Sequence, residues 1–497
     1  MSAEGVPPGR DAGVSAEGVP PGRDAGVSAA GPLEALAAIA HEPAWLVGGA
    51  VRDRVLGCST DDYDVVVAGD ARAVARSLAH ATDAHVFPLS EAFGAWRVVA
   101  RDRRWQVDVL PIAGDSIEAD LARRDFTINA IAEPLPGGGY VDPFGGLEDL
   151  RRRQLRMVSA SAFADDPLRT LRLARLACEL NLEVDEDTRR AAAAGAGALA
   201  GISPERIFAE LKRIVSADRV LDGLELMDAV GATGVVLPEL TRLRGVEQSP
   251  YHHLDVYEHT LSVLSCAVEL SRRPEPWLGE HAGAVREFLA EPLANELNRG
   301  EALRFGALLH DVAKPETRRV TAEGRITFIG HDVVGAEVAA DVLTRLKASD
   351  RLREHVAALT RNHLRLGFLV HERPIGRRAI YRYLRACEPV QVDVTLLSVA
   401  DRLATRGRGS DQAIALHLEL VRDLLGEALA WRQGRPRPPV RGDELARAVG
   451  LRPGPELGQL LAELEEASFA GEITSREQAI DRARAIVAGA SSSRFDQ

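Results

Sequence analysis

A glycine pair followed by an acidic strand constrains the fold of this chain more than any other feature. Gly48 and Gly49 end a short apolar segment, 45–47, and precede a segment with helical character. Asp62 and Asp64 then open the segment DYDVVV, which has the composition of a strand. Side chains alternate faces along a strand, so these two carboxylates point to the same side. Two ionised carboxylates repel unless a cation lies between them, so the pattern predicts a small α/β unit with a cation site.

A third carboxylate is expected beside this pair. Segments 97–101 and 105–110 have the pattern of a hairpin, and 71–81 has that of a helix. Asp108 lies inside the apolar segment WQVDVL, where a charge needs a partner. Placed next to DYDVVV, it completes the carboxylate set of two-metal phosphoryl or nucleotidyl transfer, with Mg²⁺ as the natural ion.

The glycine pair suits a phosphate site. Bare backbone between a strand and a helix lets phosphate oxygens approach amide groups, and Arg52 can clamp a phosphate. Either signal alone is more often a turn with solvated acids. Their combination with a later carboxylate strand favours a triphosphate cradle, with Asp61 as a bystander.

The rest of the chain has a helical pattern, so the fold class is α+β. We expect these parts: a disordered tail with a tandem repeat at 1–30, an α/β head at 31–147, a helical neck at 148–245, a helical histidine-rich domain at 246–410, and a helical tail at 411–497.

Composition and charge limit the kinds of partner and compartment that we expect for this chain. The net charge is −12, so binding to nucleic acid would need a local basic face, for which the neck segments 151–156 and 206–213 are candidates. The 4 cysteines include no CxxC pair, so the sequence indicates no thiolate zinc site. There is neither a long apolar run nor a signal-peptide pattern, which predicts a cytoplasmic protein without membrane contact.

With these motifs the sequence resembles the class II tRNA nucleotidyltransferases (CCA-adding enzymes) and bacterial poly(A) polymerases. The resemblance rests on VGGAVRDRVLG…DDYD, on DLARRDFTINA at 120–130, on DPFGG at 142–146 and on ISPER at 202–206. It implies a polymerase-beta-like sheet in the head, Asp62 and Asp64 as Mg²⁺ ligands, and Arg123 as a nucleotide contact. It also implies CTP, ATP and the tRNA 3′ end as partners.

The segment DDPLRTLRLAR at 165–175 resembles the family's nucleotide-choosing motif. Acids and proline suit a first helical turn, so we expect a helix to begin here, with Asp166 and Arg169 on one face. An acceptor beside a donor fits the base edges of cytosine and adenine and rejects those of uracil and guanine. The resemblance adds Arg172 and Arg175 to the nucleotide site. The sequence departs from the family at Asp165, where the family usually has glutamate.

A series of histidines and aspartates marks the region from about 251 to 407. It resembles the HD superfamily of metal-dependent phosphohydrolases, and the resemblance implies four core ligands, with two further histidines for a second metal or a phosphate: His259, His310, Asp311 and Asp401, then His331 and His363. The metal would be a divalent transition ion such as Ni, Mn, Fe or Co. A purely structural metal site stays open.

The functional prediction is template-independent addition or repair of the tRNA 3′-terminal CCA, with a second phosphohydrolase activity. A CC-only, A-only or poly(A)-adding enzyme shares this chemistry. An alternative of another class makes the HD domain the working enzyme and the N-terminal unit a tRNA-binding module.

Overall fold

The computed structural model describes residues 31–90, 94–249, 253–372, 374–407 and 409–493. The repeat expected to form a tail at 1–30 lies outside this range. The chain folds as two compact units: residues 1–122 with 129–144, and residues 123–128 with 145–497.

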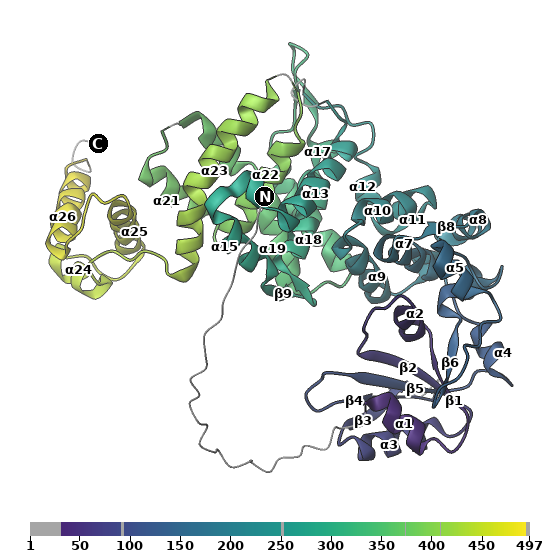
Figure 1. Cartoon of the computed structure of the whole chain (residues 1–497). Coiled ribbons are helices and arrows are strands. Elements are labelled where there is room, and N and C mark those ends of the chain that lie inside the picture. The colour runs from purple at the N-terminus through teal and green to yellow at the C-terminus, as the bar shows by residue number, and fades with distance from the viewer. Residues whose placement is uncertain (1–30, 91–93, 250–252, 373, 408, 494–497) are drawn as a thin grey trace, which may run out of the picture. The chain divides into compact units, whose positions relative to one another are not determined.

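The first unit is built on a six-stranded sheet in the order β3-β4-β5-β2-β1-β6 (Figure 1). β2 and β5 pair in parallel, and the other neighbours are antiparallel. The strands are β1 (Ala44–Val47), β2 (Asp62–Val67), β3 (His85–Ser90), β4 (Ala95–Val99), β5 (Gln106–Pro111) and β6 (Ala132–Leu135). The helices of this unit are α1 (Pro32–Ile39), α2 (Gly49–Val55), α3 (Ala71–Ala81) and α4 (Ile117–Leu121).

Helix α3 packs against β4 and β5 and so covers one face of the sheet. The guanidinium groups of Arg72 and Arg76 lie 5.3 and 5.8 Å from the Trp96 ring centroid on that face. The predicted helix at 71–81 and the predicted hairpin are confirmed. Alternation in β4 and β5 turns Arg97 and Asp108 to the face opposite Trp96, which leaves that face polar.

The second unit begins with short elements and a helical neck. The short elements are α5 (Gly146–Arg152), β7 (Gln154–Leu155), α6 (Ala162–Asp165) and β8 (Glu183–Val184). The neck helices are α7 (Arg169–Leu180), α8 (Glu186–Gly195), α9 (Pro204–Ser216), α10 (Val220–Ala229), α11 (Ala232–Val236) and α12 (Pro238–Thr241). α7 packs against α9 and α10 through an apolar core that includes Leu171, Leu211 and Met227.

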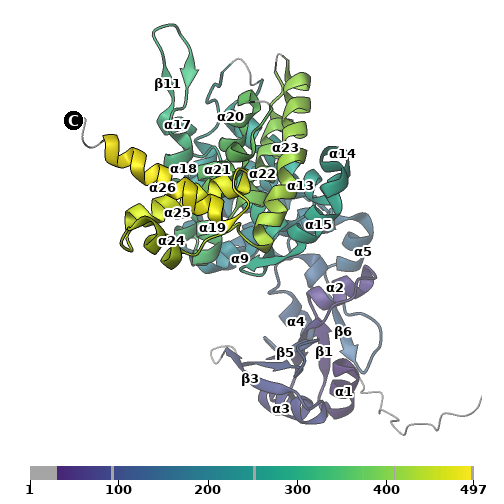
Figure 2. The ribbon, with the colours of Figure 1, turned by 90° about the vertical axis from the view of Figure 1, so that its left-hand side faces the viewer.

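The helices after the neck enclose the histidines. They are α13 (Val256–Arg272), α14 (Glu275–Leu278), α15 (Ala282–Ala290), α16 (Arg299–Leu309), α17 (Lys314–Thr317), α18 (His331–Arg345), α19 (Asp350–Asn362), α20 (Arg365–Leu369), α21 (Arg377–Ala386), α22 (Gln391–Ala404) and α23 (Ser410–Gln433). α16 lies against α13, α19 and α22. A hairpin of β11 (Arg319–Val320) and β12 (Ile326–Thr327) extends beyond α17 (Figure 2), and β9 (Pro292–Ala294) pairs with β10 (Leu297–Asn298).

The last three helices form a small core of their own. They are α24 (Gly442–Val449), α25 (Pro455–Phe469) and α26 (Arg476–Ser493), and Leu445, Leu464 and Ala483 are fully buried among them. α25 packs on α21, where Arg378 forms ion pairs with three glutamates. Within the described residues, no helix combines the length and the apolar composition needed to cross a membrane.

Candidate functional site

Three carboxylates meet on the polar face of the sheet in the first unit. Asp62 and Asp64 are two residues apart on β2, and the parallel register pairs Asp64 with Asp108 on β5. Register partners point to the same face, so the sheet brings together the three acids that the sequence singled out. Asp108 is buried, whereas Asp62 is exposed at the end of its strand.

Two neighbours of these carboxylates were not predicted. Arg97 is the register partner of Asp108 on β4, and its Nε and Nη2 donate to the two Asp108 oxygens at 2.6 and 2.7 Å. Gln106 donates from Nε2 to Asp62 Oδ1 at 2.9 Å. The hydrogen bond to Asp108 and the nearby acids together raise the pKa of the Arg97 guanidinium against the effect of burial, so the arginine is a fixed cation. Alternation along AWRVV was the available signal, because it turns Arg97 to the acidic face.

The glycine pair forms a tight entry to α2. Gly48 has φ of 71° and ψ of −136°, a conformation that favours glycine. Arg52, one turn later, is held by Asp53 Oδ1 at 2.8 Å and by Asn129 Oδ1 at 2.7 Å. A side chain at Gly49 would lie 3.5 Å from the Arg52 guanidinium. Asn129 thus orients the predicted phosphate clamp, a role that no spacing in the sequence indicated.

The nucleotide-choosing segment differs from the prediction in its helix start. α7 begins at Arg169, and Asp166 has extended backbone with φ of −147°. The carboxylate of Asp166 accepts from Leu168 N at 3.2 Å and from Arg206 Nη2 at 2.7 Å. The argument that helical spacing puts Asp166 and Arg169 on one face was therefore wrong. Pro167 explains the difference, because the residue before a proline is driven out of the helical region.

The arginines of this segment have separate partners. Arg169 donates to the Arg123 carbonyl at 2.6 Å, which fixes the backbone of that exposed residue. Arg172 pairs with the buried Asp125 at 2.8 Å. Arg175 is buried and donates to Glu210 and Glu179 at 2.6 and 2.9 Å. We interpret Arg175 as a structural ion pair between neck helices and leave it out of the proposed nucleotide site.

The basic segments of the neck are largely neutralised by acids of the same unit. Arg151 and Arg152 both pair with Glu148, and Lys212 pairs with Glu296. Because exposed pairs of this kind contribute little to stability, a phosphate backbone can displace the acids.

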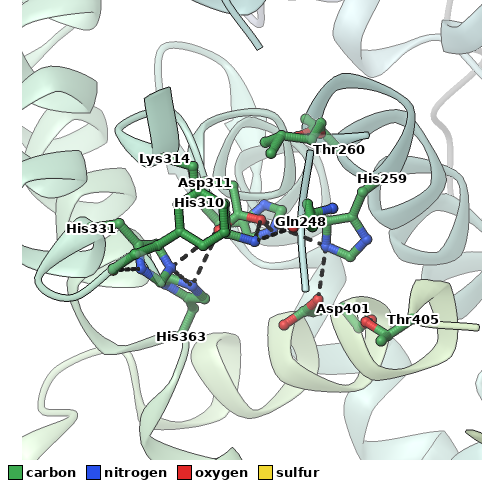
Figure 3. Close-up of polar contacts among 12 residues, drawn as sticks. Gln248, His259, Thr260, His310, Asp311, Lys314, His331, His363, Asp401 and Thr405 are labelled. Carbon is green, nitrogen blue, oxygen red and sulfur yellow. Dashed lines mark hydrogen bonds and ion pairs between the residues drawn. The ribbon is translucent and has the colours of Figure 1, made fainter. Parts of the chain in front are cut away.

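The six ligand-type residues of the HD region come together from five helices or their ends (Figure 3). They form two groups, in each of which the ligand atoms lie within 4.8 Å of one another: His259, His310 and Asp401, and Asp311, His331 and His363. Asp311 joins the groups, because Oδ2 lies 3.1 Å from His310 Nε2 and Oδ1 lies 3.2 Å from His331 Nε2.

The histidine rings are oriented by backbone carbonyls. The Nδ1 atoms of His310, His331 and His363 lie 2.8, 2.6 and 2.6 Å from the carbonyls of Ala307, Phe328 and Thr360. A carbonyl only accepts, so each Nδ1 donates and each Nε2 is left facing Asp311, where it can bind a metal ion in the neutral form of the ring. This is the arrangement by which proteins fix metal-binding imidazoles. The donor set fits divalent transition metal ions, which Asp311 could bridge.

A lysine and a glutamine complete the site. Lys314 Nζ lies 2.7 Å from Asp311 Oδ2 and 2.7 Å from Gln248 Oε1 (Figure 3). Burial acts against ionisation of Asp311, but His310 and Lys314 outweigh it and hold its pKa well below the usual range. Burial lowers the pKa of His363 to about 4, so this imidazole is a neutral ligand near pH 7. Gln248 was not predicted, since it precedes the histidine series in an irregular connection.

Family models match three parts of the chain. They are the poly A polymerase head domain at residues 44–156, the probable RNA and SrmB- binding site of polymerase A at 181–243, and the HD domain at 256–406.

Curated relatives match most of the chain. An A-adding tRNA nucleotidyltransferase of Deinococcus radiodurans is 36% identical over 88% of this chain and 94% of its own length. A CC-adding tRNA nucleotidyltransferase of Thermus thermophilus is also 36% identical, over 88% of this chain and 92% of its own length. A multifunctional CCA protein of Halorhodospira halophila is 34% identical over 66% of this chain and 75% of its own length.

Solved structures share the fold. The apo form of a CCA-adding enzyme is similar with a TM-score of 0.61 and 20% identity, over 91% of this chain and 92% of that one. The Thermotoga maritima CCA-adding enzyme complexed with tRNA has a TM-score of 0.59 at the same 20% identity, over 92% of this chain and 94% of that one. At this level of identity the likeness establishes the mixed head and the helical remainder.

Proposed function

Because the chain belongs to the family of class II tRNA nucleotidyltransferases, we propose that it adds nucleotides from CTP and ATP to the 3′ end of tRNA without a template. The observation that carries this proposal is the meeting of Asp62, Asp64 and Asp108 on one sheet face. The alignments with the A-adding and CC-adding tRNA nucleotidyltransferases cover 94% and 92% of those two proteins.

The acids and the glycine pair take the roles expected at such a centre. Asp62 and Asp64 would hold Mg²⁺, which supplies charge neutralisation for the attacking and leaving oxygens. Gly48 and Gly49 present bare backbone to the triphosphate, and Arg52 faces it from a position set by Asn129. These residues orient the α-phosphorus for attack by the terminal ribose hydroxyl.

Asp108 would accept the proton of that hydroxyl. Arg97 occupies one lone pair on each Asp108 oxygen, and a carboxylate has about four lone-pair sites in all, so acceptor capacity remains. The arginine also fixes the carboxylate plane against its strand, which limits where the proton can go.

Base choice would rest on Asp166 and Arg169. An acceptor and a donor complement the amino group and ring nitrogen that cytosine and adenine both present. Asp166 is oriented by Arg206, and Arg169 by the Arg123 carbonyl, so both are held before a nucleotide arrives. Arg123 and Arg172 would contact the nucleotide phosphates or base.

The test is incorporation of labelled nucleotides on three acceptors: tRNA that ends before CCA, tRNA that ends in CC, and oligo(A). Wild type is expected to extend tRNA with CTP and ATP but not with UTP or GTP. Asp62→Ala should abolish incorporation, whereas Asp61→Asn, one residue away and exposed, is the matched control and should keep it. Incorporation by Asp62→Ala equal to wild type would contradict the proposal.

A partial enzyme is the second candidate, favoured by the comparisons. The A-adding and CC-adding relatives are 36% identical over 88% of this chain, whereas a multifunctional CCA protein of Xanthomonas campestris is 31% identical over 86% of it. The same three acceptors separate the cases, because a CC-adding enzyme leaves tRNA ending in CC unchanged and an A-adding enzyme extends only that acceptor. Extension of oligo(A) would indicate a poly(A) polymerase.

We also propose that the HD region hydrolyses phosphate esters, including 2′,3′-cyclic phosphates. The support is the complete set of ligand atoms converging on Asp311, which would hold one or two divalent transition ions. Such ions lower the pKa of bound water and polarise phosphoryl oxygens. Lys314 and Gln248 lie where a phosphate oxygen could be received.

Hydrolysis of a 2′,3′-cyclic nucleotide, scanned over Ni²⁺, Mn²⁺, Fe²⁺ and Co²⁺, tests this second site. His310→Ala should lose hydrolysis and keep incorporation, and Asp62→Ala should show the reverse. Hydrolysis without any incorporation by wild type would instead support the head as a tRNA-binding module. Absence of bound metal and of hydrolysis under all ions would leave the site without an enzymatic role.

A further inference from the structure

The polar face of the sheet continues past the carboxylates to the edge strand. The register aligns Asp64, Asp108, Arg97 and Phe87 in one row across four strands. The next row aligns Asp62, Gln106, Val99 and His85. All eight side chains point to the same face, opposite the one covered by α3.

This continuation is a groove of about 930 Å³, built entirely from the first unit. Its lining includes Asp62 and Arg97 at one end, and Phe87, Trp105, Arg101 and Arg103 beyond them. Phe87 is 44% exposed, although a large aromatic residue on a sheet face is usually covered. The groove therefore combines an exposed aromatic ring with arginines, a composition found in single-stranded nucleic-acid sites.

The order of the strands decides which substrate the groove can serve. β1 and α2, which carry the proposed triphosphate cradle, lie on one side of β2 and β5, and β4 and β3 lie on the other. In phosphoryl transfer the attacking and leaving oxygens are roughly in line. If pyrophosphate leaves toward β1 and α2, the nucleophile must arrive from the side of β4 and β3.

We infer that this groove holds the unpaired 3′-terminal nucleotides of the acceptor RNA, with a base stacked on Phe87. The inference rests on the proposed function and adds to it the path of the acceptor strand. Arg101 pairs with Asp83 at 2.8 Å through an exposed contact that a phosphate can replace. Arg97 stays on Asp108 and marks the end of the groove, where the terminal ribose meets the carboxylates.

The test compares Phe87→Ala with Tyr140→Ala. Tyr140 is 42% exposed in the same unit, follows the opposite edge strand β6 and does not line the groove, so it is a matched aromatic control. Stacking of one base is worth about a tenfold change in affinity or more. Phe87→Ala should raise KM for tRNA ending in CC by about tenfold and leave KM for the nucleotide unchanged, while Tyr140→Ala leaves both unchanged.

A binding assay without nucleotides separates the acceptor end from the body of the tRNA. The Phe87→Ala variant should bind tRNA that has its unpaired 3′ nucleotides more weakly than wild type does. It should bind tRNA trimmed to the paired stem as tightly as wild type does. Equal weakening for both RNAs, a rise in nucleotide KM alone, or no change would overturn the inference.

Failure of the proposed function gives a different result. Wild type would then incorporate nothing on any acceptor, whereas failure of the groove leaves wild type active and Phe87→Ala unaffected. Because Phe87 is exposed on an edge strand, its removal leaves no core cavity. An unchanged melting profile checks this.

Discussion

Replacing Arg97 with methionine should destabilise the head and make its stability depend on divalent ions. Asp108 has a side chain only 10% exposed, and both of its oxygens accept from Arg97 at 2.6 and 2.7 Å. Methionine fills the volume of the arginine stem but donates nothing. The variant leaves a largely buried carboxylate beside Asp64 with its fixed cation gone.

The magnitude follows from the burial of the pair. Removing one partner of a fully buried ion pair costs about 3–5 kcal/mol. Arg97 is 28% exposed, so water reaches part of the orphaned carboxylate and we expect about 2–3 kcal/mol. For a domain of this size, 1 kcal/mol corresponds to several degrees in melting temperature, so the head transition should fall by about 10 °C.

Calorimetry measures this shift, and hydrogen exchange of the β4 and β5 amides assigns it to the head. Mg²⁺ should recover more stability in Arg97→Met than in wild type, because an ion that binds only the folded state stabilises it by mass action. Arg104→Met is the control: Arg104 pairs with Asp102 at 2.6 Å in the same hairpin but in full solvent, and should show no change.

A double variant tests the physical reason. Arg97→Met with Asp108→Asn removes both charges and should be more stable than Arg97→Met alone, because the buried unpaired carboxylate is gone. The reasoning is refuted if Arg97→Met matches wild type, or if the double variant is no more stable than the single one.

Three other experiments test separate parts of the chain. Asp64→Asn should lower nucleotide incorporation by about a thousandfold or more through loss of a metal ligand, with HD hydrolysis measured in the same preparation unchanged. Gly306→Ala should cost about 1–3 kcal/mol in denaturant unfolding, because the new methyl would lie 2.7 Å from a leucine side chain of α19, whereas Gly283→Ala, in open space on α15, should not destabilise. Burial raises the pKa of the Cys178 thiol to about 12, so it forms little thiolate at pH 8 and should resist alkylation, while the exposed Cys58 is modified first in a mass-spectrometric time course.

The parts of the fold that could be predicted were those with a clear period. The strand at 62–67, the helix at 71–81 and the hairpin of β4 and β5 follow from alternation or helical spacing and are confirmed. β3 was missed because HVFPLS contains a proline, and β6 because AEPLP does too; both are edge strands, where proline is tolerated. The two edge strands were therefore not predicted, because the prediction required an apolar pattern that no proline interrupts.

The carboxylate site was predictable because its residues are chemically unusual where they stand. A charge inside WQVDVL demands a partner, and the sheet places Asp108 between Asp64 on one neighbouring strand and its partner Arg97 on the other. Arg97 is 11 positions from Asp108, and alternation along AWRVV was the signal that could have found it, whereas Asn129 and Gln248 were not predictable because each acts through a residue far away in sequence. Arg97 depends on an antiparallel register, and Asn129 reaches Arg52 across 77 positions.

In both clusters of ligand-type residues a basic side chain pairs with a buried carboxylate. This pairing offsets the repulsion between neighbouring acids in the folded chain. In the head, Arg97 holds Asp108, and in the HD region Lys314 lies 2.7 Å from Asp311. Each cation bonds the most buried carboxylate of its group and leaves the more exposed one, Asp62 or Asp401, open toward solvent. A site of this kind holds its buried acid in a fixed orientation through the cation, so an ion would add to a site that is already folded. This contrasts with structural zinc sites, where binding of the metal supplies the free energy of folding. A metal that is not needed for the fold can be exchanged during turnover, which suits catalytic centres in both units.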